Sequence, residues 1–227
     1  MQVKLKAITP NAEVNIVEIA RVSSSRTDKS EAPEGLINYL IKNKHWSPFQ
    51  HSYITYEIVT SKAIAIQLLR HLSFTFQEFS QRYAVVEDIE PIEFRLQAEK
   101  NRQSSTEVVG KIYQYESCDL IVDLEEAFID NVEFTNWLVK VGKHLEQGMS
   151  LYKEGIELGI AKECARMILP MATKTTLYMT GSVRSWIHFL QIRDDGHAQK
   201  EAQLIAKDIK KIFVQELPVI SKALGYE

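Results

Sequence analysis

Residues 67–83 read Gln-Leu-Leu-Arg-His-Leu-Ser-Phe-Thr-Phe-Gln-Glu-Phe-Ser-Gln-Arg-Tyr and follow an apolar stretch from Ala63 to Leu69. Within thirteen residues, from Arg70 to Arg82, two arginines, a histidine, a carboxylate and a hydroxyl come together. Guanidinium groups match phosphate, while amide and carboxylate groups suit the polar edge of a ring. The stretch therefore predicts a site for an anionic ligand that carries a polar ring.

The first half of this stretch is predicted to end a helix. Ser61 is placed to cap a helix that reaches about His71. Residues three and four apart share one helix face, so Gln67, Arg70 and His71 are expected to project together. The core-facing stripe of the same helix is expected to be Ile64, Leu68 and Leu72.

The second half is predicted to be extended. Glu78, Ser80 and Arg82 recur at period two, which places their side chains on one side of an extended segment. The stretch thus presents two polar surfaces, one helical and one extended. The alternative is a capped helix end followed by solvated charges.

Outside this stretch the sequence predicts mainly helices. Alternation and β-branched residues predict strands over residues 2–8, 52–60 and 175–179. Apolar spacing and capping residues predict helices over 11–21, 33–41, 119–158, 160–169, 182–193 and 197–224. Residues 87–107 are polar and irregular and are predicted to be a long loop, whereas 108–118 fit no single pattern. Scattered strands without βαβ repeats indicate an α+β fold, and no linker separates domains, so we expect one domain over residues 1–227.

Composition excludes several classes of function. The 227 residues are 45% hydrophobic and 25% charged with a net charge of −3, which disfavours an RNA-binding module and gives no pull towards nucleic acid or anionic membrane. No stretch has the apolar length of a membrane span or a signal peptide. Cys118 and Cys164 lie in no metal-ligand spacing, so we expect a reduced cytoplasmic protein without a metal. The Rossmann, P-loop and nucleophile-elbow motifs are absent from the sequence.

A second polar cluster lies on the helix predicted to start at Ser182. Arg184 and His188 are four residues apart and share a face, while Val183, Ile187 and Leu190 form the core stripe. Arg193 falls at the end of this helix, below Trp186 and Phe189. It either complements the helix dipole or is held rigid against a planar ligand.

Two smaller clusters carry charge or imidazole. Lys162 and Arg166 are four residues apart, so they form either a solvated basic face or a pair with an anion between them. The polar loop from His45 to His51 precedes a strand, and its histidines have no metal-ligand spacing to a cysteine or carboxylate.

Taken in order, these segments resemble the flavin-dependent thymidylate synthases. The signature of that family is Arg-His-Arg, seven residues, then Ser, ending in Arg-Tyr. This sequence has Arg70-His71-Leu72, seven residues, Ser80, then Arg82-Tyr83. The resemblance extends from Ala20-Arg21-Val22-Ser23 to Arg193 and omits only residues 84–130.

The resemblance implies a helix-rich α+β domain with a small, mainly antiparallel sheet, assembled as a homotetramer with active sites between subunits. It implies FAD bound without a Rossmann fold, which agrees with the missing glycine-rich motif. It implies that dUMP is converted to dTMP, with methylenetetrahydrofolate supplying the carbon and reduced FAD, recharged by NADPH, supplying the hydride. No enzyme cysteine takes part in that reaction.

The resemblance also assigns residues. The positions that match dUMP contacts are Gln67, Arg70, Glu78, Phe79, Ser80, Gln81, Arg82, Arg166 and Arg193. The positions that match FAD contacts are Ser23, Ser47, Arg70, His71, Glu78, Ser182, Arg184 and His188. Arg193 matches the catalytic residue that activates the pyrimidine by stabilising negative charge on the ring.

Leu72 departs from the signature, in which an arginine helps to hold the flavin. Leucine offers no donor, so a lost charge-assisted hydrogen bond would weaken FAD binding by about 1.5–3 kcal/mol. Leu72 either packs inward with Ile64 and Leu68, or marks a site altered for related chemistry such as hydroxymethylation of dUMP. A nucleotide-binding relative without catalysis is a further alternative.

Overall fold

The computed structural model describes residues 1–22, 33–101, 104–115 and 119–226, so Ser23 and Cys118 lie outside the described residues. The chain divides into two compact units. Unit 1 comprises Met1, Val59–Leu68 and Glu78–Thr176, and unit 2 comprises Gln2–Ile58, Leu69–Gln77 and Leu177–Glu227. Because the chain passes repeatedly from one unit to the other, we retain a single domain over residues 1–227 as a proposal.

A four-stranded sheet, most of it in unit 2, has the order β1-β2-β7-β3. Its strands are β1 (Gln2–Ile8), β2 (Tyr53–Ser61), β7 (Lys174–Ser182) and β3 (Phe74–Glu78). Buried residues alternate along β2, where Ile54, Tyr56 and Ile58 are inaccessible to solvent. The strands predicted over 2–8, 52–60 and 175–179 are therefore confirmed, and the alternation arises because only one face of β2 meets the core.

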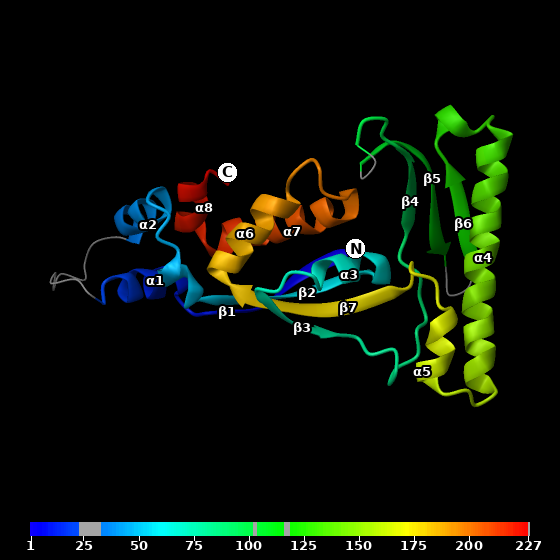
Figure 1. Ribbon diagram of the computed structural model, residues 1–227, viewed down its shortest axis with the longest axis horizontal. Coiled ribbons are helices and arrows are strands. Elements are labelled where there is room, and N and C mark those ends of the chain that lie inside the picture. Colours follow the sequence, from blue (N-terminus) through cyan, green and yellow to red (C-terminus); the bar gives the residue numbers. More distant parts are fainter. Residues whose placement is uncertain (23–32, 102–103, 116–118, 227) are drawn as a thin grey trace. The chain divides into compact units, whose positions relative to one another are not determined.

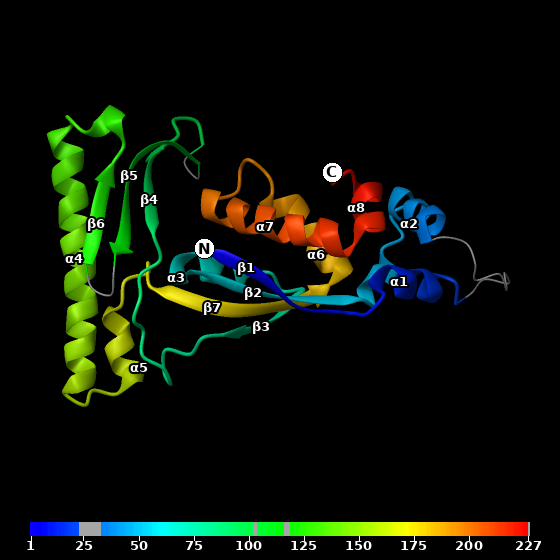
Figure 2. The same ribbon diagram turned by 180° about the vertical axis from the view of Figure 1, so that it is seen from behind.

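Helices cover this sheet in unit 2. Figure 1 shows α6 (Val183–Arg193) and α7 (Lys200–Glu216) along one face of the sheet. Seen from behind, α1 (Ala12–Ala20), α2 (Pro33–Lys42) and α8 (Pro218–Leu224) gather at one end of it (Figure 2). The predicted helix over 197–224 is in fact α7 and α8, because Pro218 has no N–H and starts a new helix. Asn11 precedes α1 as predicted, but in a left-handed conformation and without a side-chain cap.

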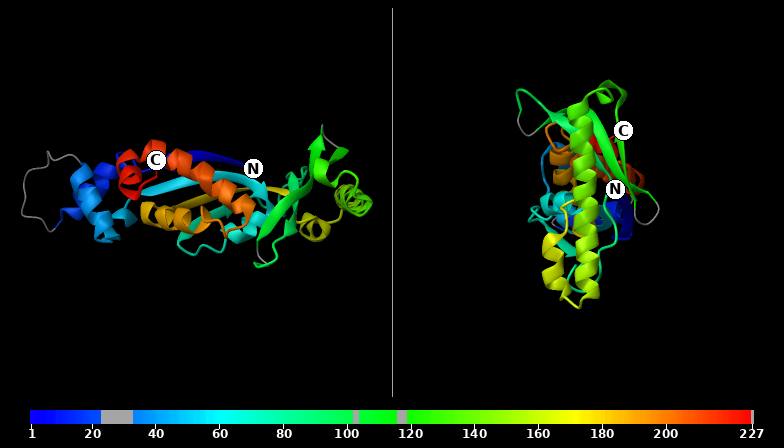
Figure 3. Two further views of the ribbon diagram at one scale, coloured as in Figure 1. Left: turned by 90° about the horizontal axis from the view of Figure 1, so that it is seen from above. Right: turned by 90° about the vertical axis from the view of Figure 1, so that its right-hand side faces the viewer.

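Unit 1 holds a second sheet, packed against a long helix. Its antiparallel strands have the order β4 (Ile92–Gln97), β5 (Ser105–Tyr115) and β6 (Asp119–Leu124). Figure 3 shows α4 (Val132–Glu157) running along this sheet. The core of unit 1 includes Ile112, Leu138 and Tyr152. The α+β class is confirmed, with two small sheets.

Three predictions in this part of the chain are wrong. The loop predicted over 87–107 contains β4 and the start of β5, since Ile92, Phe94 and Leu96 alternate towards the core of unit 1. The helix predicted over 119–158 begins only at Val132, because 119–124 pair with β5 as β6. The helix predicted over 160–169 is α5 (Lys162–Ala165) followed by the 3-10 helix η4 (Arg166–Ile168).

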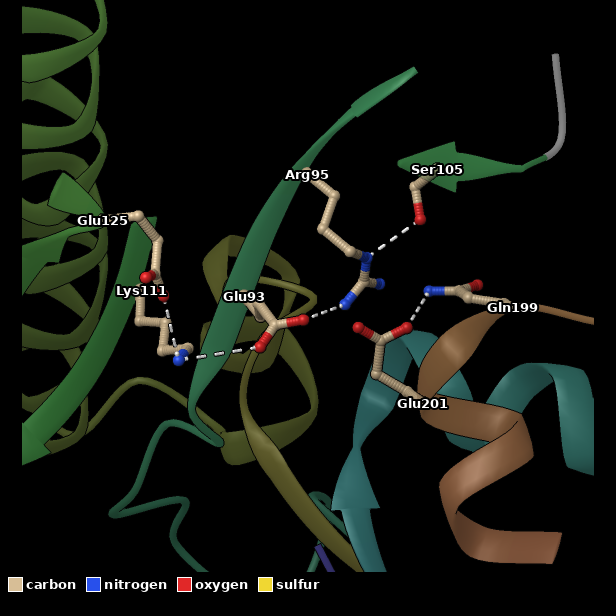
Figure 4. Close-up of polar contacts among 7 residues, drawn as sticks. All are labelled: Glu93, Arg95, Ser105, Lys111, Glu125, Gln199 and Glu201. Atoms are coloured by element: carbon tan, nitrogen blue, oxygen red, sulfur yellow. Dashed lines mark hydrogen bonds and ion pairs between the residues drawn. The ribbon is translucent and has the colours of Figure 1, made fainter. Parts of the chain in front are cut away.

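Charged side chains on β4 and β5 pair with one another (Figure 4). Arg95 donates from Nη1 to Glu93 over 2.7 Å and from Nε to Oγ of Ser105 over 2.9 Å. Lys111 on β5 lies 3.9 Å from Glu93 on β4 and 3.3 Å from Glu125, which follows β6. In unit 2, Gln199 donates to Glu201 over 2.8 Å.

Among the described residues, no helix is both long and apolar enough to cross a membrane.

Candidate functional site

The helix that precedes the polar stretch is shorter than predicted. Ser61 accepts a hydrogen bond from the N–H of Ile64 at 3.4 Å, as a capping residue does, and α3 spans Lys62–Leu68. The chain then turns at Leu69 and Arg70. The prediction that Gln67, Arg70 and His71 share one helix face is therefore wrong. Arg70 and His71 belong to the segment that leads into β3.

Leu72 does not pack inward. Its side chain is 96% exposed, whereas Ile64 and Leu68 are buried. Because α3 ends at Leu68, the apolar stripe stops there. The prediction of a continued core stripe is wrong for Leu72, so this leucine contributes little to the stability of the monomer.

Arg193 and His71 form a direct hydrogen bond. The guanidinium donates from Nε to Nε2 of the imidazole over 2.9 Å, and both side chains are half-buried. The bond joins the last residue of α6 to the segment before β3. Since Nε2 accepts, the proton of this imidazole is on Nδ1.

The surroundings of His71 keep its ring neutral. Burial, followed by the charges of Arg193 and His188, lowers the pKa of His71 to about 4. The ring meets Phe189 edge-on, with centroids 5.0 Å apart. Burial and the nearby charge of Arg70 also lower the pKa of Arg193. His71 is therefore a neutral acceptor at neutral pH, held by an aromatic ring on one side and a cation on the other.

The aromatic residues of α6 serve the core of unit 2. Trp186 is fully buried and donates from Nε1 to the backbone oxygen of Ile54 over 3.0 Å. Phe189 is fully buried too, and the predicted core stripe of Val183, Ile187 and Leu190 is confirmed. Arg193 is therefore held by the imidazole of His71 and not by the aromatic rings of α6. The spacing of residues in the sequence did not predict this contact.

A pocket of about 410 Å³ lies in unit 2 beside α6. It is lined by Trp46, Gln50, Ser73, Arg184, Ser185, Ile187, His188 and Gln191. Arg184 and His188 line it together, as their shared helix face predicted. The volume falls within the range typical of ligand pockets, and the lining combines a cation, an imidazole, amides and an aromatic ring.

Two serines predicted to contact FAD, Ser47 and Ser182, are close in sequence to residues that line this pocket. Their side chains differ in accessibility. Ser47 is exposed at the start of the 3-10 helix η1 (Ser47–Gln50). Ser182 is buried and caps α6, accepting from the N–H of Ser185 at 3.2 Å. Its hydroxyl also lies 3.0 Å from the hydroxyl of Ser185, which does line the pocket.

Glu78 is fixed by three hydrogen bonds within unit 1. Lys62 donates from Nζ to both carboxylate oxygens, over 2.8 and 2.7 Å. Thr175 donates its hydroxyl to Oε1 over 3.0 Å. The N–H of Phe79 bonds to the oxygen of Thr176 over 2.8 Å, so the chain leaves β3 from a fixed point. Lys62 and Thr175 were not among the predicted site residues, since only the fold brings them to Glu78.

The segment after Glu78 turns rather than continuing as an extended chain. The oxygen of Ser80 accepts from the N–H groups of Tyr83 at 3.0 Å and Ala84 at 3.1 Å. The predicted period-two surface of Glu78, Ser80 and Arg82 is therefore wrong beyond the end of β3. Arg82 instead lies exposed, 3.3 Å from the carboxylate of Glu163.

The two predicted ligand sets fall largely on different units. Of the positions assigned to FAD, unit 2 holds Ser47, Arg70, His71, Ser182, Arg184 and His188. Of the positions assigned to dUMP, unit 1 holds Gln67, Glu78, Phe79, Ser80, Gln81, Arg82 and Arg166. Arg193 and Arg70 are the nucleotide positions in unit 2, and Glu78 is the flavin position in unit 1.

The donor set of unit 2 fits a flavin nucleotide. The lining carries the guanidinium of Arg184, a group that matches phosphate, and the amides of Gln50 and Gln191, which match the polar edge of a ring. Leu72, whose side chain is exposed, adds no hydrogen-bond donor. In the described part of the chain, no group of three or more His, Cys, Asp and Glu side chains is arranged to hold a metal ion.

Comparisons with known proteins identify relatives along nearly the whole chain. Residues 4–219 match the family described as thymidylate synthase complementing protein. The chain is 42% identical over 217 residues to the probable flavin-dependent thymidylate synthase of Paramecium bursaria Chlorella virus 1, covering 95% of this chain and 91% of the relative. It is 40% identical over 214 residues to the flavin-dependent thymidylate synthase of Synechocystis sp., covering 93% and 88%.

A solved structure shares the fold. The crystal structure of the UMP/dUMP methylase PolB from Streptomyces cacaoi, bound with 5-Br dUMP, superimposes with a TM-score of 0.73 at 24% sequence identity. The match covers 99% of this chain and 94% of that one.

Proposed function

We propose that this chain, which belongs to the family of flavin-dependent thymidylate synthases, converts dUMP to dTMP. The carbon comes from methylenetetrahydrofolate. The hydride comes from reduced FAD, which NADPH recharges. The assignment of the nucleotide is supported by the similarity to a UMP/dUMP methylase and by the arginines of the signature.

The hydrogen bond between Arg193 and His71 is the observation that carries the proposal. Nε of Arg193 is engaged by His71 at 2.9 Å, which leaves the terminal nitrogens of the guanidinium to point at a ligand. A cation held in this way is preorganised to stabilise negative charge that develops on the pyrimidine as N3 loses its proton. A neutral His71 is required, because a protonated ring has no lone pair for Arg193.

FAD, when bound, supplies the hydride. In unit 2 the residues that would hold it are Ser47, His71, Arg184 and His188, together with the exposed Arg70 that precedes His71. Ser182 contributes by capping α6, which sets the start of the helix that carries Arg184, His188 and Arg193. Glu78 and Ser23 complete the proposed contacts.

dUMP is held chiefly by unit 1. Arg82 meets the phosphate as a charged donor, the hydroxyl of Ser80 adds a further donor, and Arg166 also contacts the nucleotide. Gln67, Phe79 and Gln81 line the nucleotide. We place Glu78, Phe79, Ser80, Gln81 and Arg82 in the nucleotide site of a neighbouring protomer of a homotetramer.

The proposed location is the cytoplasm, without metal, nucleic-acid or membrane partners.

A second candidate is hydroxymethylation of dUMP, which the exposed Leu72 favours because the usual arginine donor is missing. Mass spectrometry of the nucleotide formed from FAD, NADPH, methylenetetrahydrofolate and dUMP distinguishes the two. dTMP supports methylation and a hydroxymethyl product supports the second candidate. Unchanged dUMP, despite flavin binding, contradicts both and leaves a nucleotide-binding relative without catalysis.

A further inference from the structure

The carboxylate of Glu78 is held by two side chains to which the family resemblance assigns no role. Lys62 Nζ bonds both oxygens, at 2.8 and 2.7 Å, and the Thr175 hydroxyl bonds Oε1 at 3.0 Å. We propose that Lys62 and Thr175 are positioning residues that aim the Glu78 carboxylate at a neutral hydrogen-bond donor of the nucleotide. The inference rests on the proposed function, because it takes Glu78 as a nucleotide contact.

Backbone contacts tie the three residues to fixed elements. Lys62 is the first residue of α3, and its N–H bonds to the oxygen of Thr173 over 2.9 Å. Thr175 is buried on β7, and Glu78 is the last residue of β3. Groups held by helix and strand ends keep their geometry better than groups on loops. The carboxylate therefore has one defined orientation before any ligand arrives.

The number of acceptor positions left on the Glu78 carboxylate limits which ligand groups it can bind. An ionised carboxylate offers about four acceptor positions, and the bonds from Lys62 and Thr175 use three of them. One acceptor position is thus left for a ligand. A carboxylate repels phosphate, so the position suits a hydroxyl or a ring N–H. This assigns Glu78 to the sugar or base of the nucleotide and leaves the phosphate to Ser80 and Arg82.

The ion pair between Lys62 and Glu78 is largely shielded from solvent. The side chains of Lys62 and Glu78 are only 28% and 16% exposed. By contrast, the neighbouring pair of Lys174 and Asp88 in the same unit is 42% and 51% exposed, with 3.2 Å between its charges. Lys174 is therefore a matched control for removal of a lysine charge next to Thr175.

The test measures binding of dUMP to the FAD-loaded full-length protein by isothermal titration calorimetry. Lys62→Met keeps the aliphatic stem and removes the charge, so we expect about tenfold weaker binding. Lys62→Arg restores a charged donor and is expected to stay within about threefold of the wild type. Thr175→Val should weaken binding by about threefold, while Lys174→Met should leave it unchanged.

A double-mutant cycle separates positioning from support of the fold. If Lys62 acts through Glu78, Lys62→Met has less than about a twofold effect on dUMP binding in the Glu78→Gln background. Circular dichroism melting curves check that each variant is folded, and Thr175→Val supplies an independent reading where Lys62→Met unfolds.

Equal losses in the wild-type and Glu78→Gln backgrounds would overturn the inference, as would wild-type affinity in both Lys62→Met and Thr175→Val. Either result leaves the proposed function standing. A wild-type protein that binds FAD but no dUMP would instead overturn both proposals.

Discussion

Nε of Arg193 donates to Nε2 of His71 across 2.9 Å, which ties the end of α6 to the segment before β3. These two residues are 122 positions apart in the chain, and no sequence spacing indicates their contact. The bond makes the orientation of the proposed catalytic cation depend on the protonation state of a histidine.

Stability should depend on this histidine between pH 6.5 and 4. The pKa of His71 is lowered from 6.5 to about 4, so the unfolded chain binds the proton first as the pH falls. The stabilising contribution is complete above about pH 6.5 and is lost as the pH falls towards 4. We expect His71→Phe to flatten the pH dependence of urea unfolding in this window. His144→Asn, an exposed histidine on α4, is the control. An unchanged pH profile in His71→Phe would mean that His71 is not the titrating group.

Replacing Leu72 by arginine should strengthen flavin binding. The side chain is 96% exposed, so the change removes no packing and should alter stability by no more than about 0.5 kcal/mol. A new charge-assisted hydrogen bond is worth about 1.5–3 kcal/mol, which corresponds to roughly ten- to a hundredfold tighter FAD binding. Titration of the apoprotein followed by flavin absorbance measures this. Equal affinities for Leu72→Arg and wild type would place position 72 away from the flavin.

Removing Glu163 should tighten binding of the nucleotide. Its carboxylate lies 3.3 Å from Arg82, where it competes with the phosphate that Arg82 is proposed to hold. Exposed pairs of this kind contribute about 0.2–1 kcal/mol, so Glu163→Gln should lower the Kd for dUMP by roughly 1.5- to 5-fold. Glu157→Gln, an exposed carboxylate at the end of α4, is the control in the same calorimetric titration. A weaker complex in Glu163→Gln would show that Glu163 helps rather than competes.

Gly181 on β7 should not tolerate a side chain. A Cβ there would lie 2.4 Å from the ring of Phe74, which packs edge-on against Trp186 at 4.6 Å. The ring would have to move out of a packed cluster, at a cost of about 1–3 kcal/mol. Urea unfolding of Gly181→Ala measures this loss, with Gly196→Ala as the control, since no atom lies within 4 Å of a Cβ at that position. Equal midpoints for the two variants would contradict the packing described around Phe74.

The sequence predicted which side chains share a face only where the helix is regular. The face of Arg184 and His188 was correct because α6 is regular and its apolar stripe is clear. The arrangement of Arg70 and His71 was wrong, because nothing in the residues after Leu68 signals where α3 stops.

Contacts between distant segments could not be predicted. Lys62 and Thr175 reach Glu78 only because α3, the start of β7 and the end of β3 come together. In the same way, β4 was hidden in a polar segment, since its alternating Ile92, Phe94 and Leu96 carry a weak signal until α4 supplies the opposite face of the core.

The most direct test of methylation at this site compares wild type with Arg193→Ala in a single mixture of FAD, NADPH, methylenetetrahydrofolate and dUMP. Product identity is read by mass and flavin binding by absorbance. We predict dTMP from the wild type, and at least about a hundredfold less from Arg193→Ala with an unchanged flavin spectrum. Unchanged dUMP from the flavin-loaded wild type, or dTMP from Arg193→Ala at the wild-type rate, would contradict the account.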